Sequence, residues 1–183
     1  MLEEAAARDA ADPLAPYRAR FHLPEGVIYL DGNSLGALPK ATPARLAEVI
    51  AGEWGEGLIR SWNAADWIGL PQRVGAKIAP LVGAAPHEVI AADSTSVNLF
   101  KLIAAALAMQ AKKHGTRRKV VLSEPGNFPT DLYMVEGLAR QGLAECRLRP
   151  REELAAGLDE DVALLLLTHV HYKTGALHDI ATL

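Results

Sequence analysis

The chain has 183 residues, half of them hydrophobic and 22% charged, a composition typical of a globular protein with a buried core. Its net charge of −3 argues against nucleic acid or an anionic membrane as a partner, and its single cysteine, Cys146, excludes an internal disulfide and favours a reducing compartment. The acidic first residues lack the features of a secretory signal and the longest strongly apolar run, 162–167, is too short to span a membrane, so we expect a cytoplasmic protein with no membrane partner.

Helical patterns dominate the first half of the sequence. Thr42 and Pro43 suit a helix start, because Thr can cap a helix and Pro tolerates its first position. Apolar residues then recur at helical spacing and predict one buried face, made by Leu46, Val49, Ile50 and Trp54. The expected elements are, in chain order, a helical arm (1–24), a short strand (27–30), a helix from Thr42, an irregular segment (55–67) and a helix from Pro71 to Gly83.

Strands and helices alternate in the second half. The expected elements are a strand (89–92), a long helix (94–113), a strand (119–123), a helix (130–141), a strand (145–148), a short helix (151–158) and a strand (162–168). The long helix is apolar nearly all round, which predicts that it is buried, and the last strand is apolar throughout, as in a strand covered on both faces. The alternation predicts an α/β layer with a mostly parallel sheet. The sequence stops where a further helix begins, so we expect a truncated polypeptide.

The segment D-S-T-S at 93–96 lies between a predicted strand and the long helix. In parallel α/β sheets, ligands bind beyond the carboxyl ends of the strands, and a helix start offers free N–H groups to an anion such as a phosphate. A cap needs only one hydroxyl, so plain capping and phosphate binding both remain open. Neither the P-loop pattern nor the dinucleotide-binding glycine pattern is present, which argues against a nucleotide.

The segment N-F-P-T-D at 127–131 follows the next strand. Phe128 could stack on a flat cofactor, and Asp131 could accept a hydrogen bond from a ligand. The alternative is structural, because a carboxylate in the first turn of a helix also complements the helix dipole.

Two histidines and a lysine follow the last strand. His169 and His171 could chelate a metal, but the only further candidates nearby are His178 and Asp179, so we expect no metal site. Lys173 could form a Schiff base, although an exposed loop lysine is the commoner case. We expect the Cys146 thiol to pack in or beside a strand, without a partner that would activate it.

Five motifs resemble those of the kynureninases, enzymes of the aminotransferase-like fold (fold type I) that use pyridoxal phosphate (PLP). They are Y-L-D-G-N-S-L-G at 29–36, E-W-G-E-G-L-I-R-S-W at 53–62, D-S-T-S-V-N-L at 93–99, N-F-P-T-D at 127–131 and T-H-V-H-Y-K-T-G at 168–175. Their order and spacing match across nearly the whole chain. The resemblance implies a helical arm and substrate-side loop (1–60), followed by the N-terminal part of a fold type I PLP domain (61–183).

The resemblance also implies an activity. Kynureninases are homodimers that hydrolyse L-kynurenine, or 3-hydroxykynurenine, to anthranilate, or 3-hydroxyanthranilate, and L-alanine in tryptophan catabolism. The family's Schiff-base lysine lies beyond Leu183, and Lys173 matches a different loop, so we expect no catalytic lysine here and no activity of this chain alone. The alternatives are another fold type I PLP enzyme, such as a cysteine desulfurase-like enzyme or an aminotransferase, and a non-catalytic module that binds a phosphate ligand.

Ten residues are implied as ligand contacts. The residues implied to bind PLP are Thr95 and Ser96 at its phosphate, Phe128 on its pyridine ring, and Pro129, Thr130, Asp131 and Thr168 around it. The residues implied on the substrate side are Asn33, Ser34 and Trp62, the last with its neighbour Asn63 as an alternative. The opening loop at 29–39, which composition alone assigns as a connector, is thereby expected to reach the active site.

Overall fold

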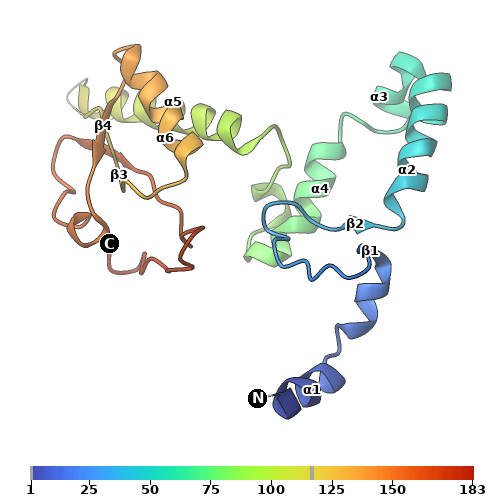
Figure 1. The fold of residues 1–183 in the computed structure, drawn as a ribbon. Helices are drawn as coiled ribbons and strands as arrows, with labels where there is room; N and C mark the ends of the chain where they lie inside the picture. Colours follow the sequence, from blue (N-terminus) through green and yellow to red (C-terminus); the bar gives the residue numbers. More distant parts are fainter. Residues whose placement is uncertain (1, 116–117) are drawn as a thin grey trace. The chain divides into compact units, whose positions relative to one another are not determined.

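The computed structural model describes residues 2–115 and 118–183, and the chain forms two compact units, Met1–Ile90 (unit 1) and Ala91–Leu183 (unit 2) (Figure 1). The expected division at residue 60 concerns the arm and PLP domain of the family and stays a prediction. None of the helices in the described part of the chain has the length and apolarity that a membrane crossing requires.

Unit 1 consists of short helices and one small antiparallel ladder. Its elements are α1 (Leu2–Ala11), η1 (Ala15–Arg20), β1 (Phe21–His22), β2 (Leu38–Pro39), α2 (Thr42–Glu48), η2 (Val49–Glu56), η3 (Leu58–Arg60), α3 (Ser61–Ala64), α4 (Leu70–Ile78), η4 (Ala79–Val82) and η5 (Pro86–Glu88). Strands β1 and β2 pair Phe21 with Pro39 and His22 with Leu38.

Two predicted helix starts in unit 1 are confirmed. Helix α2 begins at Thr42 with Pro43 in its first turn, although Ala41 is the cap residue and Thr42 is already helical. Helix α4 begins beside Pro71 and continues through η4 to Gly83, whose φ of 71° lies in the left-handed region that glycine favours.

Other predictions for unit 1 are wrong. The strand predicted at 27–30 does not form, because this segment belongs to a loop whose ends are joined by β1 and β2 instead. The segment 55–67, predicted to be irregular, contains η3 and α3. The predicted apolar face of α2 and η2 is exposed, for example at Ile50 (57%) and Trp54 (65%). Helical periodicity identifies which face of a helix is apolar, but it does not show that a partner covers that face.

The carboxylate of Glu53 joins three parts of unit 1. It pairs with the Arg45 guanidinium and accepts a hydrogen bond of 2.6 Å from the indole Nε1 of Trp67, while the Glu53 carbonyl accepts one from Ser61. The Trp67 hydrogen bond and then the Arg45 contact lower the pKa of Glu53. Polar contacts therefore hold unit 1 together where a core is missing, since Ala79 is the one buried hydrophobic side chain among its described residues.

Unit 2 is an α/β layer with a parallel sheet, as predicted. Its elements are α5 (Thr95–His114), β3 (Val120–Ser123), α6 (Pro129–Arg140), β4 (Glu145–Leu148), η7 (Arg151–Glu153) and β5 (Val162–Leu165). The strand order is β4-β3-β5, and both pairings are parallel. Helices α5 and α6 lie side by side (Figure 1) and pack against the sheet through a core made by Ile103, Leu107, Val121, Val135, Leu138, Ala144 and Ala163.

Four predictions for unit 2 need correction. The segment 89–92 is not a strand, because a strand needs a neighbour for its ladder and no described residue pairs with it. Helix α5 has the expected length but is not buried all round: Ile103 and Leu107 are buried, whereas Met109 is 72% exposed. The helix predicted at 151–158 is only the short η7 followed by turns, and the last strand ends at Leu165 rather than Thr168.

The exposed apolar faces lead to a prediction about stability. We expect the 183-residue chain alone to melt without a sharp cooperative transition and to self-associate, because large apolar side chains of α2, η2 and α5 remain in water. Differential scanning calorimetry and sedimentation of the purified chain measure both properties. A single sharp transition of a monomer would contradict this expectation.

Candidate functional site

Polar side chains are buried where the central strand β3 ends. Ser123 is 0% exposed and Asn127, in the turn that follows, is 4% exposed. The Ser123 hydroxyl donates to the Leu166 carbonyl oxygen (2.7 Å), and the Asn127 amide nitrogen donates to the Ser123 hydroxyl oxygen (3.1 Å). These bonds connect the carboxyl ends of β3 and β5, which is where parallel α/β sheets bind ligands.

The Asn127 amide also holds two of the residues implied to bind the cofactor. Its oxygen accepts hydrogen bonds from the Thr168 hydroxyl (2.6 Å) and from the Phe128 backbone N–H (2.8 Å). We call Ser123, Asn127, Leu166 and Thr168 the strand-end network. Ser123 was not singled out from the sequence, and Asn127 was named only as the first residue of the N-F-P-T-D motif, without a role of its own. The polar residues after the apolar run V-V-L were a signal for both.

A group of rings lies beside this network. Phe128 is 43% exposed, and its ring meets that of Tyr172 edge to face with 5.0 Å between the centroids. The His171 ring stacks on Tyr172 at 5.4 Å, and the Lys173 ammonium lies 5.4 Å from the centroid of the same ring. The structure thus fixes the Phe128 ring at the strand end while part of it remains accessible. Lys173 is exposed, in agreement with an ordinary loop lysine.

Asp131 is the third residue of α6 and is only 8% exposed. Its carboxylate has no hydrogen-bond or ion-pair partner among residues 2–115 and 118–183, and burial raises its pKa. Its oxygens are not among the fully buried unpaired side-chain atoms of the described residues, so they keep some access to solvent and could accept from a donor supplied by a ligand. Its neighbours Pro129 and Thr130 form the first turn of the same helix.

Helix α5 begins with one capping hydroxyl and two further hydroxyls. The Ser94 hydroxyl oxygen accepts from the Val97 backbone N–H (3.4 Å) and is the cap. The Thr95 and Ser96 hydroxyls make no hydrogen bond to the described part of the chain, and Thr95 is exposed while Ser96 is half-buried. Capping therefore leaves two hydroxyls and the helix N-terminus available to an anion. No described hydrogen bond or ring contact joins them to Phe128 or Thr168.

The residues implied to contact the substrate all lie in unit 1. The Ser34 hydroxyl donates to the Asp31 carboxylate (2.7 Å), and the Tyr29 hydroxyl bonds to the carbonyl oxygens of Asp31 and Leu35. The loop 29–36 is therefore closed on itself beside a hollow of about 520 Å³, but neither Asn33 nor Ser34 lines that hollow.

Trp62 lies on another segment of unit 1. It is 50% exposed and its ring meets that of Trp67 edge to face at 6.5 Å. No described hydrogen bond or ring contact joins Trp62 to the loop 29–36.

The histidines of the last loop have other partners. His171 Nδ1 accepts from the backbone N–H groups of Lys173 (3.2 Å) and Thr174 (3.3 Å), and His178 Nε2 lies 2.9 Å from Glu124 Oε1 in a buried pair. No group of three or more metal-binding side chains occurs within the described ranges. The Glu124–His178 pair was not predictable from the sequence, because its members lie far apart in the chain.

The cysteine packs as predicted. Cys146 lies in β4 and contacts the core of unit 2, and burial, together with the charge of Glu136, raises the pKa of its thiol. A raised pKa leaves little of the reactive thiolate at neutral pH.

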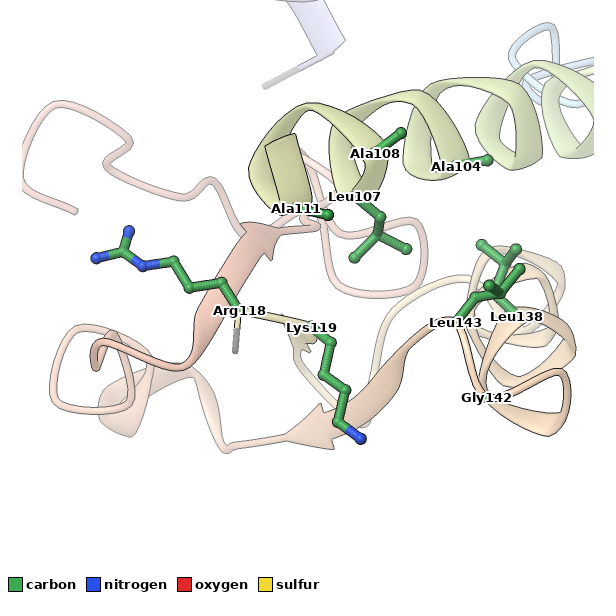
Figure 2. A pocket seen from close by; sticks show the side chains of 9 residues that line it. All are labelled: Ala104, Leu107, Ala108, Ala111, Arg118, Lys119, Leu138, Gly142 and Leu143. Carbon is green, nitrogen blue, oxygen red and sulfur yellow. The ribbon is translucent and has the colours of Figure 1, made fainter. Parts of the chain in front are cut away.

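A second hollow, of about 340 Å³, lies at the opposite end of unit 2 (Figure 2). It is formed by small and apolar residues of α5, the end of α6 and the turn that follows it, with Arg118 and Lys119, directly before β3, also lining it. In Figure 2 both cationic side chains extend away from Leu107 and Leu138. The hollow thus offers an apolar wall and no convergent polar groups, unlike the strand-end network.

Comparison with known proteins agrees with the motifs. No protein-family profile matches the chain. The kynureninases of Burkholderia mallei (strain SAVP1) and Burkholderia pseudomallei (strain K96243) are each 54% identical to it over 181 residues, and that of Pseudomonas fluorescens is 54% identical over 180 residues. Each match covers 97% of this chain but only 43% of the relative's length. Over nearly its whole length the chain is therefore similar to kynureninases, of which it spans less than half.

Proposed function

We propose that the chain is the N-terminal part of a cytoplasmic, homodimeric kynureninase that hydrolyses L-kynurenine, or 3-hydroxykynurenine, to the corresponding anthranilate and L-alanine with PLP as cofactor. The observation that carries this proposal is the 54% identity to kynureninases over 97% of the chain. The matched stretch includes all five motifs that suggest ligand contacts, since they fall between residues 29 and 175.

The residues present fit PLP. Thr95 and Ser96 would hold its phosphate, because their hydroxyls are free and the start of α5 favours an anion. Phe128 would stack on its ring, and the unpaired carboxylate of Asp131 would receive a proton-bearing group of the cofactor. Pro129, Thr130 and Thr168 would complete the wall. When bound, PLP supplies the electron sink for cleavage next to the amino acid's α-carbon.

The residues of this chain would bind and orient rather than carry out the chemistry. Asn33, Ser34 and Trp62 are proposed to approach the substrate, and the rings of Phe128 and Tyr172 would shield the cofactor from water. Lys173 is not assigned a covalent role, because its ammonium lies on an exposed turn against Tyr172. We therefore propose that the 183-residue chain is inactive alone and that activity needs the remaining length seen in the relatives.

Two other functions would use the same features. A different fold type I PLP enzyme would also need the phosphate site and the stacking ring. A non-catalytic module would need only the free hydroxyls at the start of α5. The identity to kynureninases favours the first proposal over both.

Activity is tested on two proteins, the 183-residue chain and the complete product of the gene read in frame. We expect the complete protein, supplied with PLP, to release anthranilate from L-kynurenine, and the 183-residue chain to release none. Anthranilate fluorescence measures both.

Two control assays report the alternative activities. Cysteine as substrate reports desulfurase activity, and an amino acid together with a 2-oxo acid reports aminotransferase activity. A complete protein that turns over either one and leaves kynurenine intact would refute the proposal. Anthranilate release by the short chain would refute its inactivity.

Asp131→Asn is expected to affect stability and cofactor binding in opposite directions. Burial raises the pKa of Asp131 in the folded state above that in the unfolded state. The stability linked to its protonation is therefore fully present at a pH below the unfolded-state pKa, and it is lost as the pH rises through the folded-state pKa. At neutral pH the variant should therefore stabilise the PLP-free complete protein by roughly 1 kcal/mol, with no gain in acid. It should also weaken PLP binding.

Urea unfolding at two pH values and PLP titration by absorbance measure the two effects. Glu136→Gln, on an exposed position of the same helix, is the matched control and should change neither by much. If Asp131→Asn lowers stability at neutral pH, the carboxylate has a structural partner and the assignment is wrong.

Ser34→Ala is expected to raise the KM for L-kynurenine or lower kcat by roughly two- to tenfold, the range for one lost hydrogen bond, without loss of folding. Asp31→Ala breaks the same loop contact but keeps the Ser34 hydroxyl, so it should have the smaller effect. Steady-state kinetics of the complete protein separate the cases. Unchanged kinetics in Ser34→Ala would return the loop to a connector.

A further inference from the structure

Each hydrogen bond of the strand-end network has a fixed donor and acceptor, and the Leu166 carbonyl determines those on its side of Asn127. The Leu166 carbonyl oxygen can only accept a hydrogen bond. The Ser123 hydroxyl, 2.7 Å away, must therefore donate its single proton to that oxygen. Toward Asn127 the Ser123 oxygen can then only accept. The Asn127 atom at 3.1 Å must therefore be the amide nitrogen.

The second end fixes the same orientation independently. The Phe128 backbone N–H can only donate, so the Asn127 atom 2.8 Å from it must be the amide oxygen. The Thr168 hydroxyl lies 2.6 Å from this oxygen, which has no proton to give. Thr168 must donate, and its only proton is used in this bond.

Burial keeps this order in place. Ser123 is fully buried and Asn127 nearly so, which leaves little room for water to replace a broken bond. Turning the Asn127 amide round would place its nitrogen, a donor, against the Phe128 N–H, which is also a donor. It would also place the amide oxygen against the Ser123 hydroxyl oxygen, whose proton is already donated to Leu166. Both contacts would be lost inside the protein, where unpaired polar groups are costly.

We propose that Asn127 is a positioning residue that makes Thr168 a hydrogen-bond acceptor toward the cofactor, an inference that rests on the proposed function. With its proton held by Asn127, the Thr168 oxygen presents only lone pairs to a ligand. The ligand group at Thr168 must then bring a proton on oxygen or nitrogen, and an unprotonated oxygen is disfavoured there. The phosphate accordingly belongs at the start of α5, and a protonated group of the ring system belongs at Thr168.

A double-mutant cycle in the complete protein tests this. The variants are Asn127→Ala, Thr168→Val and the two combined, and PLP dissociation constants are measured by absorbance titration. We expect Asn127→Ala to weaken PLP binding about tenfold on its own but less than about twofold in the Thr168→Val background, because the two residues act through one bond. Thr168→Ser keeps the hydroxyl and should retain most of the affinity.

Equal losses in the two backgrounds would overturn the proposal, because a purely structural role of Asn127 does not depend on the Thr168 hydroxyl. No loss in either background would overturn it as well. If Asn127→Ala does not fold, Ser123→Ala takes its place in the cycle, since it removes the acceptor that orients the amide.

Failure of the proposed function gives a different result. A wild-type protein that binds no PLP refutes that function, and the hydrogen-bond order is then judged on the ligand-free protein by NMR hydrogen exchange. The side-chain amide protons of Asn127 should be protected in the wild type and exchange faster in Ser123→Ala. Unprotected protons in the wild type would overturn the inferred order.

Discussion

The Asn127 amide is the interaction on which the candidate site depends. Strand β3 lies between two parallel neighbours, and all four of its residues are buried. Any polar group at its end must therefore find a partner inside the protein. One amide meets this requirement for Ser123, Phe128 and Thr168 together, so the same bonds that complete the sheet also fix the residues that would face a cofactor.

The two units are stabilised in different ways. In unit 2 a continuous core between the sheet, α5 and α6 gives the strand ends a rigid support. In unit 1 the best-connected residue is a carboxylate, Glu53, while the apolar face of α2 and η2 is exposed. An apolar face exposed in this way is typical of a surface that contacts another segment or chain.

The sequence predicted the fold where the local pattern was sufficient. Alternating strands and helices gave the parallel sheet, and proline and glycine marked the ends of α4 and η4. Long-range partners decided the rest: the segment 89–92 has strand composition but no neighbour, and the strands that do form in unit 1, β1 and β2, have only two residues each. A two-residue ladder leaves no periodic signal in a sequence.

The sequence motifs predicted which residues belong to the candidate site, but not which side chains contact one another there. Phe128, Asp131 and Thr168 were found through their resemblance to a family, and the structure adds that Phe128 and Thr168 share Asn127 and that Asp131 is buried without a partner. Ser123, which bonds to the Asn127 amide, lies 43 residues from its partner Leu166, and the neighbouring Glu124 lies 54 residues from its partner His178. Side-chain pairing over that distance cannot be deduced from composition or spacing.

The most direct test of this account is a crystal structure of the complete protein with PLP bound. We expect the phosphate within hydrogen-bond distance of the Thr95 and Ser96 hydroxyls, the pyridine ring against Phe128, and a protonated group of the cofactor facing the Thr168 oxygen. A cofactor bound away from the ends of β3 and β5, or a phosphate bound at Thr168 in place of the start of α5, would contradict it.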